Sequence, residues 1–397
     1  MSSKVLLHVG TPKTGTSYLQ DALFLNRKLL RAHGILYPAD RFDGHFLGAL
    51  DLMRLPWGGL ETEAVGAWDR LAEQVRGWSG TAIISHEILA HASAPQIERA
   101  LASLGDAEMH VIVSARDLVR QIPAEWQENV KHRRVISYGN FLEAIRDPAR
   151  ATETGSWFWA VQELPDILAR WGGTLPASQV HVITVPKPGS PRTLLWERFT
   201  ETFGLGGLRL DLQDERSNPS LGVPETALMR RINRAVNDVL PPADYRPLVR
   251  ELLAHQTLSR RTTSPRLAVP ADVHAWASEL AGSWVTALRE RGYAVTGDLD
   301  ELLPDATVAT FVDPDNPKEA LVNNAALDAI KALLLENARL RHDEERLHQE
   351  VRDRDDALRR AYLRPSYRLR EKAVARLEGG RLINAYRRAR GRSSRSA

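Results

Sequence analysis

Cysteine is absent from the 397 residues of this chain. That absence excludes disulfide bonds, thiolate metal sites and a cysteine nucleophile. Long apolar runs are absent too, since no stretch approaches the ~18 consecutive apolar residues that a membrane-spanning helix needs. The first 20 residues hold only the short apolar run 5–9. We therefore expect no signal peptide, and the cytoplasm is the expected compartment.

Lysine is scarce: the chain has 8 Lys against 45 Arg, so a lysine in a special position is informative. The charge is unevenly distributed, with a net +9 in residues 361–397 and a net −6 in residues 1–360. An acidic body with a basic tail indicates that the tail has a partner of its own. We expect no nucleic acid to bind the body, although the tail alone leaves that open.

Continuous apolar runs alternate with stretches of helical spacing in the first half of the chain. The expected strands are 4–10, 35–37, 81–85, 110–114 and 180–185. The expected helices are 17–33, 61–78, 95–104, 118–134 and 193–203, and the region 224–293 is helical with breaks at 241–242 and 264–270. Such alternation is typical of a parallel sheet covered by helices on both faces. The expected fold class is therefore α/β, three-layered, with a central and mostly parallel sheet.

The chain divides by composition into four parts. Residues 1–310 form the α/β domain, 311–320 are a linker containing Asp313–Pro317, 321–362 are a long helix, and 363–397 are a basic amphipathic tail. Ile330, Asn337, Glu344, Val351 and Leu358 share one heptad position of the helix, and Leu333, Leu340, Leu347, Arg354 and Ala361 share the other. This pattern predicts either a short coiled coil that makes a homodimer or a single amphipathic helix that folds back on the body.

The tail combines many arginines with apolar residues such as Val374, Leu377 and Ile383. This pattern is typical of a peripheral attachment to an anionic membrane surface, on the inner face of the membrane. The alternative is a disordered basic tail with no fixed partner.

The loop between the first strand and the first helix carries the strongest functional signal. It reads Gly10-Thr11-Pro12-Lys13-Thr14-Gly15-Thr16-Ser17. A loop of this kind cradles a phosphate, because its N–H groups and the helix N-terminus converge on one anion. Its two glycines are spaced as in the P-loop of nucleoside triphosphatases, but the lysine stands at position 13 and not at 16. That displacement disfavours an ATP-dependent kinase, which remains the less favoured alternative.

The segment HVGTPKTGTSYLQ resembles the 5′-phosphosulfate loop of sulfotransferases that use 3′-phosphoadenosine-5′-phosphosulfate (PAPS). The resemblance covers about residues 1–300 and implies a P-loop-like fold. It implies that Lys13 contacts the bridging oxygen and the sulfuryl group. It also implies that Thr14, Gly15, Thr16 and Ser17 hold the 5′-phosphate, and that no metal is required.

A second signature of the same family follows the strand at 110–114. The family pattern is R-[DN]-P-x-x-R with a later Ser, and it holds the 3′-phosphate of PAPS. Here Arg116, Asp117 and Arg120 match, whereas Leu118 replaces the Pro and Ala124 stands where the Ser is expected. The resemblance implies that Arg116 and Arg120 bind the 3′-phosphate. The missing hydroxyl keeps a second alternative open, a non-catalytic membrane-associated scaffold on the same fold.

Sulfuryl transfer also needs a base for the proton of the acceptor hydroxyl. Glu87 and His86 directly follow the strand at 81–85, and many family members have a similar S-x-E there. We favour Glu87, with His86 close behind, and His45 is a weaker candidate.

Other segments carry weaker signals. Arg216–Leu221 resembles a late nucleotide contact of the family, and Arg260–Thr263 resembles its late basic loop. An acceptor groove lined by aromatic residues is another prediction, with Trp126, His132, Trp157 and Trp159 as candidates. The expected acceptor is a hydroxyl group on a carbohydrate or glycolipid.

Overall fold

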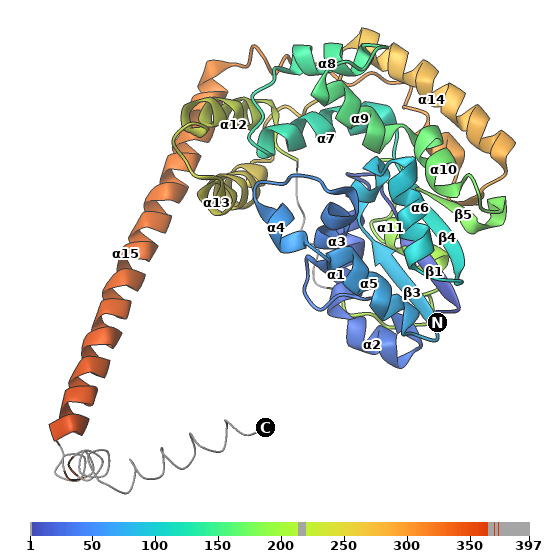
Figure 1. Cartoon of the computed structure of the whole chain (residues 1–397). Helices are drawn as coiled ribbons and strands as arrows, with labels where there is room; N and C mark the ends of the chain where they lie inside the picture. Colours follow the sequence, from blue (N-terminus) through green and yellow to red (C-terminus); the bar gives the residue numbers. More distant parts are fainter. Residues whose placement is uncertain (1, 213–219, 364–368, 370–371, 373–397) are drawn as a thin grey trace, which may run out of the picture. The chain divides into compact units, whose positions relative to one another are not determined.

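The chain, seen here as a computed structural model, is described for residues 2–212, 220–363, 369 and 372. It divides into two compact units, Met1–Ala329 and Ile330–Ala397. The first unit contains the sheet and nearly all helices (Figure 1).

The centre of the first unit is a sheet of six strands, all parallel, in the order β2-β3-β1-β4-β5-β6. The strands are β1 (Lys4–His8), β2 (Ile35–Leu36), β3 (Thr81–Ser85), β4 (Glu108–Ala115), β5 (Val180–Thr184) and β6 (Ala294–Thr296). This confirms the α/β prediction and the expected parallel sheet. The chain passes from β1 to β2 and β3 on one side and then to β4 on the other side of β1. Open α/β sheets bind ligands in a crevice beyond the carboxyl ends of the strands at such a switch in direction, so the candidate crevice lies at the ends of β1 and β4.

Helices connect the strands and cover the sheet. In the first half they are α1 (Thr16–Leu25), α2 (Arg27–Ala32), α3 (Gly44–Met53), α4 (Leu60–Ala64), α5 (Ala67–Arg76), η1 (Glu87–His91), α6 (Ala94–Ser103), α7 (Leu118–Lys131), α8 (Tyr138–Arg146), α9 (Glu153–Gln162) and α10 (Leu164–Gly172). The later ones are η2 (Ala177–Gln179), α11 (Leu194–Thr202), α12 (Val223–Val236), α13 (Pro242–Tyr245), the π-helical η3 (Arg246–Thr257), η4 (Leu258–Arg260), α14 (Ala271–Arg291), η5 (Leu299–Leu302) and α15 (Glu319–Leu363).

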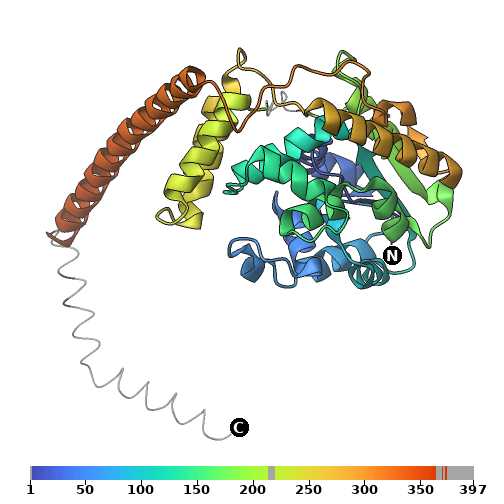
Figure 2. The same cartoon turned by 90° about the horizontal axis from the view of Figure 1, so that it is seen from above.

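The core lies on both faces of the sheet. On one face, α1, α2 and α11 pack onto the strands through a buried cluster that includes Leu6, Leu19, Ile112 and Phe199. Helices α6 and α10 lie on the other face (Figure 1). Helix α14 packs against α7 and α10 (Figure 2). The three layers predicted from the alternating pattern are therefore present.

Some predicted elements differ from the observed ones for local reasons. The helix expected over 17–33 is interrupted at Asn26, whose side chain donates to the carbonyl oxygens of Ala22 and Asp211. The helix expected over 61–78 is interrupted before Gly66, which has a φ of 72°. Strand β6 was not predicted, because three half-exposed residues at the sheet edge carry almost no apolar signal.

The segment predicted as a linker packs against the first unit. The Asp315 carboxylate accepts the backbone N–H groups of Tyr138 (3.0 Å) and Gly139 (2.8 Å) and pairs with Arg230. The first turns of α15 bury Val322 in the same unit. The division between the units therefore falls inside α15 and not at residues 311–320.

Candidate functional site

The loop Gly10–Ser17 joins the carboxyl end of β1 to the start of α1, at the crevice. Gly10 and Gly15 have φ values of 131° and 89°, which side chains rarely permit. A Cβ atom on Gly10 would lie 2.9 Å from the carbonyl oxygen of Glu87. The glycines are thus required by the path of the chain, and the loop presents its backbone without side chains at these two points.

Strand β4 holds the loop in place through Ser114. The Thr11 N–H donates to the Ser114 carbonyl oxygen (2.8 Å), and the Ser114 N–H donates to the Gly10 carbonyl oxygen (2.6 Å). The Thr14 hydroxyl lies 2.6 Å from the Ser114 hydroxyl and donates to the Thr11 carbonyl oxygen. Because the Thr14 side chain is fully buried and already bonded, this hydroxyl shapes the loop.

The start of α1 offers further donors to an anion. Gly15 occupies the N-cap position without a side-chain cap, and the first turn of the helix has no acidic residue. Ser17 is exposed, whereas Thr16 is buried and hydrogen-bonds the Glu87 carboxylate. Since the first N–H groups of a helix lack partners within it, this end of α1 favours negative charge.

Lys13 lies inside the loop with its ammonium group on a carboxylate of α7. Its Nζ forms an ion pair with Glu128. The same carboxylate accepts from Arg250 of η3 (3.1 Å), lies 3.2 Å from Nε2 of His132 and 3.9 Å from Nζ of Lys131. Burial raises the pKa of Glu128, but Lys13, His132 and Lys131 hold that pKa well below its ordinary value. The carboxylate is therefore ionised and acts as the shared counter-ion of a cationic cluster.

One cation of that cluster is unusually poor in partners. The Lys131 side chain is only 4 % exposed, and its sole ion pair within the described residues is the 3.9 Å contact with Glu128. Burial lowers the pKa of Lys131 to about 8. In the same cluster, Nε of Arg250 is buried and has no hydrogen-bond partner in the described part of the chain.

Arg116 follows β4 at the same edge of the sheet. Its Nε donates to Oε1 of Gln121 (2.8 Å), and Gln121 donates in turn to the carbonyl oxygen of Pro12 in the loop. Its Nη2 donates to the Arg120 carbonyl oxygen (3.0 Å). Among the described residues Arg116 has no carboxylate partner. Burial and the neighbouring Arg120 lower the pKa of Arg116 to about 10, so it stays charged at neutral pH.

Arg120 is fixed more firmly. Its Nε pairs with Asp117, the N-cap residue of α7, and its Nη1 donates to the Pro186 carbonyl oxygen (3.0 Å). Its Nη2 is buried without a hydrogen-bond partner among the described residues. Of the two predicted arginines, Arg116 has the charge less compensated by the protein.

Glu125 lies between the two motifs and was not predicted. It is 5 % exposed, and its Oε1 lies 3.4 Å from Nε2 of Gln162. The positive charges of Lys13 and Arg116 both favour its ionised form. Burial raises the pKa of Glu125 to about 7.

Gln121, Glu125 and Glu128 share one face of α7 at spacings of four and three residues. The helical spacing of these three polar residues is the feature of the sequence that could have indicated this face. The face joins the loop after β1 to Arg116.

The candidate bases follow β3. The Glu87 carboxylate is half-buried and accepts from Nε2 of Gln20 (2.9 Å). Burial raises the pKa of Glu87, but His86 and the hydrogen bond from Gln20 bring it below the ordinary value. Burial lowers the pKa of His86, whose Nδ1 accepts the Ile88 N–H (3.3 Å). At neutral pH both side chains are unprotonated and able to accept a proton.

His45, the weaker candidate, is buried under this region. Its Nδ1 accepts the N–H of Ser85 (3.2 Å), and its ring packs on Tyr37. Burial lowers the pKa of His45 to about 3. These contacts give the residue a structural role in the strand end.

Half-buried aromatic rings extend from His86 to the cationic cluster. Phe46 contacts both His86 and Trp57, with ring centroids 5.2 and 5.6 Å apart. Trp57 contacts His132 and Trp157 at 5.7 and 6.1 Å. Two of the four predicted groove residues, His132 and Trp157, therefore lie here. The prediction is wrong for the other two, Trp126 and Trp159, because both side chains are buried in the core.

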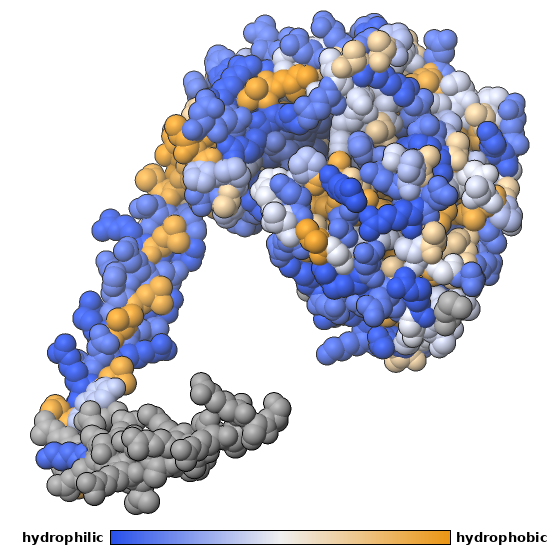
Figure 3. Space-filling view, in the orientation of Figure 1, coloured by the Kyte–Doolittle hydropathy of each residue, from blue (hydrophilic) through white to orange (hydrophobic). Residues whose placement is uncertain are grey.

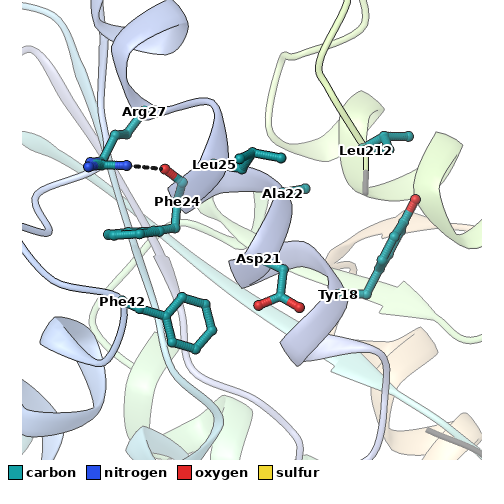
Figure 4. Close-up of a pocket in the computed structure, with 8 residues that line it drawn as sticks. All are labelled: Tyr18, Asp21, Ala22, Phe24, Leu25, Arg27, Phe42 and Leu212. Carbon is teal, nitrogen blue, oxygen red and sulfur yellow. Dashed lines mark hydrogen bonds between the residues drawn. The ribbon is translucent and has the colours of Figure 1, made fainter. Parts of the chain in front are cut away.

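A cavity of about 260 Å³ lies beside α1, immediately after the loop. Figure 4 shows Tyr18 and Leu212 on one side of the helix and Phe24 and Phe42 on the other. The ring of Tyr18 also contacts Trp196 of α11 at 5.5 Å. The cavity therefore offers apolar and aromatic walls along α1, and Tyr18 in its lining directly follows Ser17 of the loop in the chain.

The remaining predicted segments lie elsewhere. Arg261 is held by the carboxylates of Glu225 and Asp328 and acts in packing. Residues 216–219 of the segment Arg216–Leu221 lie outside the described residues, whereas Leu221 exchanges two hydrogen bonds with Gln127. Most of the basic tail also lies outside the described residues.

The described residues contain no group of three or more His, Asp or Glu side chains that could hold a metal ion. None of their helices has the length and apolarity that crossing a membrane requires.

No protein-family model matches the chain, and no curated protein matches it. Among solved structures, the chain is similar to a sulfotransferase from Alicyclobacillus acidocaldarius, with 20% sequence identity and a TM-score of 0.36. The similarity covers 62% of this chain and 94% of that protein.

Proposed function

We propose that this chain is a PAPS-dependent sulfotransferase that acts on a hydroxyl group of a carbohydrate or glycolipid. One observation carries the proposal: the Lys13 loop and Arg116 meet at the switch point of a parallel sheet, joined by Gln121. Two separated cationic sites on one crevice suit a nucleotide with phosphates at both its 5′ and 3′ positions.

The residues present fit such a donor. The glycine-bearing loop and the start of α1 would hold the 5′-phosphosulfate, while Arg116, and to a lesser extent Arg120, would hold the 3′-phosphate. The cavity beside α1 begins at Tyr18, directly after the loop, and offers an aromatic face for the nucleoside. No carboxylate neutralises the Arg116 guanidinium among the described residues, so its charge is available to the 3′-phosphate.

The transfer then follows from simple chemistry. The acceptor oxygen attacks the sulfur in line with the bond to the 5′-phosphate, which breaks as the new S–O bond forms. Lys13 stabilises the charge that develops on the leaving oxygen. Glu87 takes the acceptor proton, and His86 is the alternative base. The products are a sulfate ester and adenosine 3′,5′-bisphosphate.

The acceptor class rests on the half-buried aromatic residues. Sugar rings pack well on aromatic side chains, and Phe46, Trp57 and Trp157 are half-buried rings that contact one another between the candidate base and the cluster around Glu128. A membrane-bound glycolipid remains the other form of this acceptor, brought to the site by the basic tail.

The donor assignment is tested by calorimetric titration of adenosine 3′,5′-bisphosphate, with ATP and Mg²⁺ as the comparison ligand. We expect micromolar binding of the bisphosphate, weakened about tenfold or more in Lys13→Ala. Lys28→Ala, an exposed lysine on α2, is the matched control and should bind like the wild type. Binding of ATP without the bisphosphate would replace the proposal with a kinase, and binding of neither would replace it with a scaffold.

The base assignment needs a separate measurement. Glu87→Gln should lower the rate of sulfuryl transfer about 100-fold and leave the affinity for the bisphosphate unchanged. His86→Asn should lower the rate much less. The reverse order of the two variants would move the role of base to His86.

A further inference from the structure

The second unit presents an apolar stripe along α15 that has no covering partner in the described part of that unit. Its members stand at the two heptad positions and include Ile330, Leu333, Leu340, Leu347, Val351 and Leu358. Each of these side chains is between 41 and 57 % exposed. Figure 3 shows apolar residues recurring along this helix among hydrophilic ones. A repeat of this kind covers itself by pairing with another helix.

Two charged residues interrupt the stripe and restrict the geometry of pairing. Glu344 and Arg354 occupy heptad positions that face a partner helix. In a parallel pair of identical helices, each would meet its own copy, so two carboxylates and two guanidiniums would face each other. In an antiparallel pair, the first heptad position meets the second, and Glu344 of one copy can meet Arg354 of the other.

We propose that α15 pairs with α15 of a second copy of this chain as an antiparallel coiled coil in which Glu344 faces Arg354. This register is selective, because a shift by one heptad in either direction sets Arg354 against Val351 or Asn337. The same register brings Leu347 opposite Val351 and Leu340 opposite Leu358, so four of the six apolar residues of the stripe also match one another.

The flanking charges agree with this arrangement. Three of the five charged residues at the heptad positions next to the stripe already pair along their own helix: Glu336 and Asp343 pair with Arg339, and Glu350 pairs with Arg346. Arg341 and Asp355 form no ion pair within the described residues. In the proposed register these two flanking positions lie next to each other across the interface, twice by symmetry. The interaction goes beyond the proposed enzymatic function and does not depend on it.

The absence of cysteine makes disulfide cross-linking a direct test on the full-length chain. Leu340→Cys and Leu358→Cys are prepared separately, with tags of different mass, and mixed before oxidation. In the antiparallel register position 340 meets position 358, whereas two copies of position 340 lie about 27 Å apart at 1.5 Å per residue. A disulfide requires Cα atoms within about 7 Å. We expect a mixed disulfide dimer and no cross-link in either variant alone.

Self-linked dimers of the single variants would overturn the proposal in favour of a parallel pair. A monomer in sedimentation velocity at tens of micromolar would overturn it altogether.

Reversing the charges of Glu344 and Arg354 provides a second, independent test of the register. Glu344→Arg should weaken dimerisation about tenfold or more, and the double variant Glu344→Arg with Arg354→Glu should restore it. A double variant as weak as the single one would contradict the pairing of these two residues.

Discussion

At the residue scale, Lys13 and Glu128 set the charge of the candidate site. The lysine that would bind the donor is held by a carboxylate, so an incoming anion competes with Glu128 for it. The Glu128 carboxylate also balances Lys131 and Arg250. One residue therefore stabilises the fold and opposes anion binding at the same time.

Replacing Glu128 by Gln separates these two effects. Because three cations lose their counter-ion, we expect the melting temperature to fall by a few degrees, about 1–2 kcal/mol. The affinity for adenosine 3′,5′-bisphosphate should rise several-fold in the same variant, as measured by calorimetry at low salt. Glu73→Gln, an exposed change on α5, is the control. A parallel loss of affinity and stability would show that Glu128 orients Lys13 for the ligand.

His8 lies beneath the loop and links three strands. Its Nδ1 lies 2.8 Å from the Ser85 hydroxyl, and its Nε2 lies 3.1 Å from the Ser114 hydroxyl. Burial lowers the pKa of His8 to about 4. The folded chain therefore binds this proton less readily than the unfolded chain, whose histidines titrate near 6.5. The stability that neutral His8 provides is complete above pH 6.5 and is lost as the pH falls toward 4.

The change in the free energy of unfolding between pH 7 and pH 5 is measurable by chemical denaturation. His8 alone should cost the wild type about 2 kcal/mol of unfolding free energy over that interval. His8→Asn should start less stable at pH 7 but lose correspondingly less on acidification. His33→Asn, an exposed histidine, should behave as the wild type does. An unchanged pH slope in His8→Asn would mean that His8 is not the group responsible.

At the scale of elements, the loop between β1 and α1 depends on its first glycine. A Cβ atom at position 10 would meet the Glu87 carbonyl oxygen at 2.9 Å and the Cβ atom of Ala90 at 3.3 Å, at a φ of 131°. Gly10→Ala must therefore move η1, which carries the candidate base, or distort the loop.

We expect Gly10→Ala to destabilise the chain by about 2 kcal/mol and to reduce binding of the bisphosphate more than tenfold. Gly206→Ala is the matched control, because an added Cβ there meets nothing within 4 Å. Thermal unfolding and calorimetry measure the two effects. Normal affinity in Gly10→Ala would show that the loop does not bind the nucleotide.

Five of the six strands and the positions of the two motifs could be predicted from the sequence, because each is a local pattern. Apolar runs define β1, β3, β4 and β5, and the loop after β1 has its glycines and lysine at fixed spacing. Gln121, Glu125 and Glu128 were missed because they are ordinary polar residues of a helix. Only the packing of α7 on the loop after β1 makes them neighbours of Lys13 and Arg116. The burial of Trp126 in the core likewise could not be predicted without the tertiary structure.

At the scale of the whole molecule, the division at 329/330 separates the candidate site from the apolar stripe of α15. Every residue assigned here to the donor site lies in the first unit. Truncation after Ala329 should therefore leave the affinity for the bisphosphate within about twofold of the wild type and abolish dimerisation. Calorimetry and sedimentation velocity on the truncated chain test both statements. A loss of affinity together with dimerisation would mean that the site needs the second unit.

The central claim is that one nucleotide bridges the Lys13 loop and Arg116. The most direct test compares adenosine 3′,5′-bisphosphate with adenosine 5′-monophosphate, in the wild type and in Arg116→Ala. Removing the 3′-phosphate from the ligand and removing the guanidinium from the protein should each weaken binding about tenfold to a hundredfold. If the two groups meet, both changes together should weaken binding no more than either alone. Arg116→Ala weakening both ligands equally would contradict the claim.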